Sequence, residues 1–150
     1  MRKALKGVLV LLCLVVLAGQ LLPYPKAENP PEETEVAAPA EVRGILRASC
    51  YDCHSHETVW PWYSHVVPAK WLVRNHVTEG REHLNFSAWN RYDAQRAARK
   101  LEEVVEMVEK GAMPLQGYVA LHKGAELTPD EAELLIRWAR ELAAGGGGGD

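Results

Sequence analysis

Apolar and polar positions divide the chain into a long hydrophobic run, a proline-rich stretch and a region of helical periodicity. The run extends from Gly7 to Leu22, with Gln20 as its polar interruption, and three basic residues precede it. A basic flank before an apolar stretch is typical of an export signal. The run also approaches the ~20 residues that cross a bilayer as a helix. We therefore predict a signal or transmembrane anchor over residues 1–22.

The sequence around the end of this run favours retention over cleavage. Leu17-Ala18-Gly19 offers small residues before a cut, but there is no Ala-x-Ala pattern, and Gln20 stands where a lipoprotein signal needs cysteine. We favour an uncleaved anchor, with cleavage and release into the periplasm as the alternative. Because positive charge keeps the N-terminal end in the cytoplasm, the domain is expected on the periplasmic side of the cytoplasmic membrane.

Two segments of biased composition frame the predicted domain. Residues 23–40 are rich in Pro, Glu and Ala, which is typical of a solvated, semi-extended tether. Residues 145–150 contain five consecutive glycines, which favours a flexible tail because ordering glycine costs the most backbone entropy. The domain is therefore expected over residues 41–144.

Within 41–144 the apolar spacing is helical, and no convincing strand is present. A first stripe leads into a pair of cysteines, a short helix is expected after Pro68, and a longer one from about Asp93 to Lys110. The stripe residues are Val42, Ile45 and Leu46 in the first case and Leu101, Val104, Val105 and Val108 in the last. The pattern predicts an all-α domain.

The final helix carries its own start signal. Thr128 stands at the N-cap, Pro129 at the first helical position and Glu131 at the third, which together form a capping box. Apolar residues then follow on one face, namely Leu134, Leu135, Trp138 and Leu142.

The candidate cofactor-binding residues are Cys50, Cys53 and His54, which form a Cys-x-x-Cys-His motif. This arrangement is typical of c-type haem attachment. On one helical turn, thiols three residues apart share a face and can both reach the vinyl groups along a haem edge. We therefore predict one covalently attached haem c, with His54 as the proximal iron ligand.

Three other interpretations of the same cysteines are open. A structural zinc site needs four ligands, and no second cysteine pair exists. A thioredoxin-like dithiol belongs to a parallel-sheet fold, which the helical pattern does not provide. A Cys50–Cys53 disulfide is possible in an oxidising compartment.

The sixth iron ligand is predicted to be Met113. It follows Gly111-Ala112 and precedes Pro114, so it is pushed out of the helical conformation and into a loop. Met107 falls inside the predicted helix, where packing is the default role of methionine. His122 is the second choice. The other histidines are expected to be solvated or hydrogen-bonded, with His56 at the surface, and they are His56, His65, His76 and His83.

The net charge of the domain limits the classes of molecule that it is expected to bind. From residue 27 onward the chain has 13 basic and 20 acidic residues, a balance of −7. This acidity argues against nucleic-acid binding and permits attraction to a basic redox partner, whose identity the sequence does not give. No catalytic nucleophile or substrate pocket is indicated, so no independent enzyme is predicted.

Beyond these single motifs, most of the domain resembles one known family. The stretches CYDCHSHETVWPWYSHVVPAKWLV, EGREHLNFSAWNRY, EEVVEMVEKGAMPLQGYVALH and ELTPDEAELLIRWA resemble the bacterial haem-binding domain family of small, membrane-anchored, single-haem proteins. The resemblance implies a cytochrome c-like fold, haem attachment through Cys50, Cys53 and His54, and a Met-Pro motif at Met113. The chain departs from the family pattern at Leu115 and Lys123, where the family often has proline.

Three functions are therefore weighed. The first is one-electron transfer outside the cytoplasmic membrane with iron held by His54 and Met113, because Met/His ligation raises the reduction potential. The second is a haem-based sensor that binds a gas or peroxide at an open or displaceable distal position. The third is a haem-free interaction module closed by a disulfide.

Large aromatic side chains at Trp60, Trp62 and Tyr63 could either line a porphyrin or pack in the hydrophobic core.

Overall fold

The structure is a computed structural model that describes residues 2–24 and 28–145. These residues are 66% helical and contain no strand, which confirms the all-α prediction. The α-helices are α1 (Arg2–Leu21), α2 (Ala40–Ser49), α3 (Tyr51–His54), α4 (Ala69–His83), α5 (Ala94–Glu109), α6 (Gln116–Leu121) and α7 (Pro129–Ala143). Two 3₁₀ turns, η1 (Trp62–His65) and η2 (Trp89–Arg91), connect them. Apart from Gly145, the predicted glycine tail lies outside the described residues.

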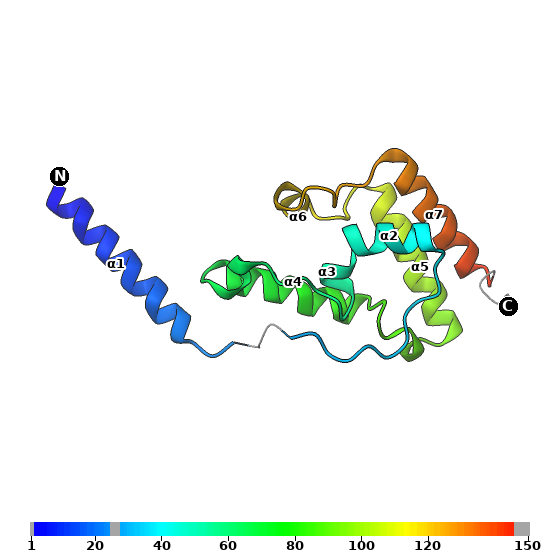
Figure 1. The fold of residues 1–150 in the computed structure, drawn as a ribbon, viewed down its shortest axis with the longest axis horizontal. Coiled ribbons are helices and arrows are strands. Elements are labelled where there is room, and N and C mark those ends of the chain that lie inside the picture. The colour runs from blue at the N-terminus through cyan, green and yellow to red at the C-terminus, as the bar shows by residue number, and fades with distance from the viewer. Residues whose placement is uncertain (1, 25–27, 146–150) are drawn as a thin grey trace.

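Helix α1 projects away from the other helices (Figure 1). Its apolar side chains are exposed along its length, and Gly19 is its buried residue. Among the described helices, α1 is the one long and apolar enough to cross a membrane, and a signal sequence has the same properties.

Helices α5 and α7 pack against each other and form one wall of the core. The Asp93 side chain caps α5 by accepting a hydrogen bond from Arg96 N over 2.7 Å. The capping box predicted at Thr128 and Glu131 is present at the start of α7. The Thr128 cap is therefore confirmed, and α5 begins one residue after Asp93, where the periodicity placed the start of that helix.

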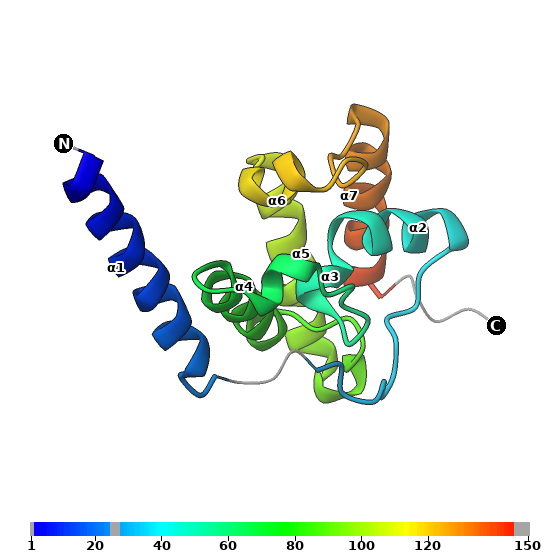
Figure 2. The same ribbon diagram turned by 60° about the vertical axis from the view of Figure 1, so that its left-hand side comes forward.

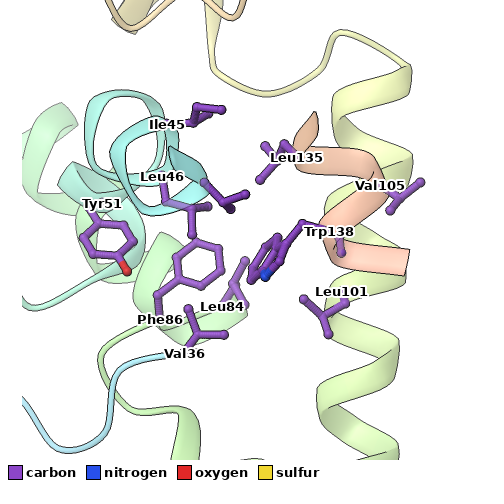
Figure 3. Packing of buried hydrophobic residues seen from close by; sticks show 12 residues of the cluster. Val36, Ile45, Leu46, Tyr51, Leu84, Phe86, Leu101, Val105, Leu135 and Trp138 are labelled. Carbon is purple, nitrogen blue, oxygen red and sulfur yellow. The ribbon is translucent and has the colours of Figure 1, made fainter. Parts of the chain in front are cut away.

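Helix α2 forms the opposite wall and leads directly into α3, with Cys50 as the single residue between them. Leu46 is fully buried, and Tyr51 stacks on Phe86 with ring centroids 5.6 Å apart. Figure 3 shows Leu46 and Phe86 facing Leu135 and Trp138 of α7, with Tyr51 on the other side of Phe86. The core therefore fixes the turn of chain that carries the cysteines.

The second half of the expected tether contacts the core through one buried residue, Val36. Val36 is 1% exposed, and its N–H donates to Phe86 O over 2.9 Å. Thr34 forms a bridge with Ala88, and the Tyr51 hydroxyl donates to Glu35 over 2.8 Å. The expectation of a solvated segment is wrong at Val36, because one buried valine among polar and proline residues gives no periodic signal.

Helix α4 has 15 residues and is longer than the short helix expected after Pro68. It packs against α3 at Gly80, where an added Cβ would lie 2.5 Å from Cys53 O. A side chain at this position would collide with backbone, so glycine permits the close contact of the two helices.

Candidate functional site

The two cysteines lie within a single turn of chain between α2 and α3. Cys53 N and His54 N both donate to Cys50 O, over 3.1 and 2.9 Å. Neither thiol is in a disulfide. Burial, with the neighbouring Cys53, raises the pKa of the Cys50 thiol to about 12, and burial with Asp52 raises the pKa of Cys53 to about 11. Both side chains are therefore neutral thiols at neutral pH.

The His54 imidazole is held by one of its two nitrogens. Nδ1 lies 2.9 Å from Gly80 O and 3.0 Å from Leu84 O, both at the end of α4. Since a carbonyl only accepts hydrogen bonds, Nδ1 carries the proton and Nε2 keeps its lone pair. No described residue hydrogen-bonds Nε2. Burial lowers the pKa of His54, which favours the neutral ring that a metal needs.

An apolar cavity of about 380 Å³ lies beside the motif. Its size falls in the range of about 300–1,000 Å³ that small-molecule and cofactor pockets occupy. Three regions form its walls: the motif with residues 58–63, one face of α4, and α6 with the residue before it. The lining residues most relevant to the site are Cys53, Tyr63, His76, Leu115, Tyr118 and His122.

Asp52, between the two cysteines, ties the walls of this cavity together. Its Oδ2 accepts a hydrogen bond from the Tyr118 hydroxyl of α6 over 2.7 Å. Its Oδ1 accepts from Val59 N over 2.8 Å. Burial and the bond to Asp52 both raise the pKa of Tyr118, so the phenol stays protonated and remains a donor.

Met113 and His122, the two predicted distal ligands, are placed differently. Met113 lies in the turn before α6, its side chain is 37% exposed, and its N–H donates to Met107 O over 3.2 Å. It is not among the described residues that line the cavity, although Leu115 is. The Met113 loop therefore reaches the cavity through Leu115, whereas Met113 itself does not line it.

His122 lines the cavity and has a fixed tautomer. Its Nδ1 lies 2.9 Å from Tyr118 O, so Nδ1 carries the proton. Its Nε2 accepts a hydrogen bond from the Tyr63 hydroxyl over 3.3 Å. Unlike the Nε2 of His54, the Nε2 of His122 is therefore already hydrogen-bonded, and it would have to give up the Tyr63 hydroxyl in order to ligate iron.

His56 corrects an expectation, because it is 7% exposed and does not lie at the surface. Its Nδ1 lies 2.8 Å from Pro31 O, and Asn85 Nδ2 lies 2.8 Å from its Nε2. Both ring nitrogens are therefore engaged, and the side chain fixes the chain after the motif to the strap formed by residues 28–36.

The aromatic cluster after the motif divides between two environments. Pro61 and Tyr63 line the cavity, whereas Trp62 is 78% exposed. Trp138 belongs to the core and donates to Ala37 O over 3.3 Å. Core packing is therefore seen at Trp138, and Tyr63 lines the cavity, while a role in lining a porphyrin stays a prediction.

Sequence reasoning missed Arg81, which fixes the chain that leaves the motif. Its Nε donates to Ser55 O over 2.7 Å, and its Nη2 donates to Thr58 Oγ1 over 2.9 Å. Asp52, Tyr118 and Gly80 were also missed as site residues. A single sequence offers no signal for them, because their roles arise from contacts between distant segments.

The residues present fit a haem attached through two thioethers. The two thiols are free and sit on one turn, the adjacent imidazole offers Nε2, and an apolar cavity borders Cys53. A hydrogen bond from the second nitrogen to a backbone carbonyl is one of the usual ways in which a ligating histidine is oriented.

Comparison with known proteins gives one match. A family model described as a haem-binding domain matches residues 13–141 of the chain. No curated protein and no solved structure matches it.

Proposed function

Because this chain belongs to the haem-binding domain family, we propose that it carries one covalent haem c and transfers single electrons on the periplasmic side of the cytoplasmic membrane. In this proposal Cys50 and Cys53 form the thioether bonds and His54 is the proximal ligand. α1 is the membrane anchor, with a cleaved signal as the alternative. We assign no catalysed reaction to the protein.

The observation that carries the proposal is the fixed orientation of His54. Two carbonyl acceptors hold Nδ1–H at 2.9 and 3.0 Å, and Nε2 is left with a lone pair. A histidine that served only to pack would gain nothing from leaving one nitrogen unpaired in a partly buried site, since unpaired buried polar groups cost free energy.

When bound, the haem supplies an iron that cycles between the ferrous and ferric states. The chain's own residues supply the rest. The thioethers at Cys50 and Cys53 keep the group attached, and the carbonyls of Gly80 and Leu84 keep the imidazole in one tautomer and one plane. The apolar cavity wall excludes water, which tunes the potential through the local dielectric.

For the sixth ligand we propose Met113, with His122 as the competing candidate. Met113 starts a loop with freedom to present its thioether, and Met/His ligation suits electron transfer. His122 is favoured by its place on the cavity wall and by its Nδ1 bond to Tyr118 O. Either ligand closes the distal position.

The test is an absorption spectrum of the full chain matured with the haem-attachment machinery, recorded in both oxidation states with and without carbon monoxide. We expect a porphyrin retained after denaturation and a six-coordinate spectrum that carbon monoxide changes slowly. The double variant Cys50→Ala/Cys53→Ala loses the retained porphyrin, and the matched variant Cys13→Ala keeps it.

Two outcomes would contradict the proposal. A colourless denatured protein with unmodified polypeptide mass would exclude covalent haem and support a disulfide-closed interaction module. Rapid carbon monoxide binding to the reduced protein would exclude a closed distal position. It would favour a sensor, a role for which the apolar cavity beside Cys53 offers space.

A further inference from the structure

The end of α1 is hydrogen-bonded to the segment before α4. Gln20 Oε1 accepts from Val67 N over 3.1 Å, and Gln20 Nε2 donates to His65 O over 2.5 Å. Lys70 Nζ donates to Gln20 O over 3.4 Å. Residues 65–70 are thus held where the apolar helix ends.

Close packing strengthens this contact. An added Cβ at Gly19 would lie 3.1 Å from Val67 and 3.3 Å from the Trp71 ring, so the absence of a side chain lets α1 approach. The Tyr24 hydroxyl donates to Trp71 O over 3.2 Å. The start of α4 is therefore fixed next to the point at which α1 leaves the bilayer, if α1 is the proposed anchor.

Large apolar side chains are exposed around the mouth of the cavity. Val59, Leu72 and Leu121 line the cavity and are 74%, 59% and 68% exposed, and Trp62 is 78% exposed beside the lining residue Tyr63. We call Val59, Trp62, Leu72 and Leu121 the mouth face. In both views of the fold, α4 and α6 are the elements of the domain on the side of α1 (Figures 1 and 2).

The charge of these segments differs from that of the rest of the domain. Residues 58–78 and 110–125 contain no Asp or Glu, and their charged residues are Lys70, Arg74, Lys110 and Lys123. The chain from residue 27 onward carries a balance of −7. These two segments therefore contribute no acidic side chain that phosphate headgroups would repel; the acidic groups near them include Asp52, which lines the cavity, and Glu106, which pairs with Lys110.

We propose that the mouth face lies on the outer surface of the bilayer that α1 crosses, with Trp62 and Leu121 among the lipid headgroups. The inference rests on the proposed role of α1 as an anchor. Tryptophan favours this interfacial region because its ring is apolar and its N–H is polar. Exposed apolar side chains with nearby basic residues bind a lipid surface by burial and by attraction to anionic headgroups.

The test uses the full-length holoprotein in nanodiscs that contain a photoreactive phospholipid and a fraction of anionic lipid. Cross-linked residues are located by mass spectrometry. We expect cross-links along residues 8–17 of α1, within 59–72 and within 115–123, and none on α5 or α7. Trp62→Ser/Leu121→Ser should lower the cross-linking of 59–72 and 115–123 severalfold. Met107→Ser, on the exposed side of α5, should leave it unchanged.

The outcomes separate the two proposals. Cross-links along 8–17 without any at the mouth face would overturn the inference, and would point to a protein partner for this surface. An absence of cross-links along 8–17 would overturn the anchor and the inference together. Retained porphyrin and the iron spectrum report haem binding in the same samples, independently of lipid contact.

Discussion

Gly80 serves two residues of the site at once. Its Cα faces the backbone of Cys53, and its carbonyl accepts from His54 Nδ1. Side-chain volume at this one position therefore affects both the packing of α3 on α4 and the orientation of the imidazole.

We expect Gly80→Ala to destabilise the holoprotein by about 1–3 kcal/mol, the usual cost of overpacking. The added Cβ would meet Cys53 O at 2.5 Å, and the backbone must move. Gly44→Ala in α2 is the matched control, because nothing lies within 4 Å of its added Cβ. It should gain roughly 0.5–1 kcal/mol from helix propensity. Denaturant unfolding measures the stability of the two variants. Equal changes in stability would contradict a close contact between Gly80 and Cys53.

Substitution of Met113 tests whether Met113 or His122 is the distal ligand, and Met107 provides the control. Met113 and Met107 are both 37% exposed, so their truncation costs similar burial. We expect Met113→Ala to lower the reduction potential by on the order of 100 mV, since axial ligands set haem potentials over about 0.8 V. Met107→Ala should leave the potential unchanged. Redox titration followed by absorption measures this.

The same titration on His122→Ala completes the comparison. An unchanged potential and ferric spectrum in Met113→Ala, together with a changed spectrum in His122→Ala, would replace the methionine with the histidine. His122 is the residue expected to take this role because its side chain lines the cavity.

At the residue level, the Cys-x-x-Cys-His motif could be predicted from the sequence, but the side chains and carbonyls that surround it could not. Cys50, Cys53 and His54 are recognisable because haem attachment requires fixed spacing along the chain. The burial of His56 was not predictable, because its partners Pro31 and Asn85 are 25 and 29 residues away in sequence.

At the level of elements, α7 depends on a defined start. Thr128 Oγ1 accepts from Glu131 N, and Glu131 Oε2 accepts from Thr128 N over 2.9 Å. The rest of α7 contributes Leu135 and Trp138 to the core. Fraying at the first turn of α7 therefore weakens a helix whose side chains pack in the core.

We expect Thr128→Ala to lower the free energy of unfolding by about 1 kcal/mol, and Thr128→Ser to restore it, because serine caps equally well. Thr78→Ala, at an exposed site inside α4, is the matched control and should change stability by less than about 0.5 kcal/mol. Thermal or denaturant unfolding measures the difference. A Thr128→Ala protein as stable as Thr78→Ala would show that the cap contributes nothing.

The capping carboxylate also gives α7 a pH dependence. The bonds from Thr128 hold the pKa of Glu131 below its ordinary value. Its contribution is therefore complete above the unfolded pKa and is lost as pH falls through the lower, folded pKa. Glu131→Gln should reduce the stability difference between neutral and acidic pH, as denaturant unfolding across that range will show.

Periodicity predicted the elements that bury one face and missed those that do not. α5 and α7 follow a repeated apolar stripe; the bounds of α5 agree with the prediction to within a residue, and α7 begins at the predicted Pro129. α4 exceeds its prediction because its packing uses Gly80 and Lys70 as well as apolar residues. α6 buries no residue fully and has no stripe to detect.

At the level of the whole molecule, the strap of residues 28–36 closes the core from outside the predicted domain. Val36 belongs to the core cluster and lies beside Phe86, as Figure 3 shows. The folded unit therefore depends on chain that the composition alone assigned to a tether.

We expect Val36→Ala to cost about 1.5–3 kcal/mol of stability through lost burial and the cavity left behind. Val59→Ala, at a valine that is 74% exposed, should cost less than about 0.5 kcal/mol. Denaturant unfolding of the two holoproteins in detergent measures this. If both valines cost the same, the strap does not belong to the core.

Helix α4 joins two ends of the molecule that lie far apart in sequence. Its first turn holds Lys70 and Trp71, which contact the end of α1, and its last turn holds Gly80, which contacts the imidazole. A 15-residue helix is a rod of about 22 Å. In the proposed function, this rigid helix would set the distance between the haem iron and the point at which α1 leaves the membrane. Electron exchange would then be restricted to partners whose redox centres reach that level.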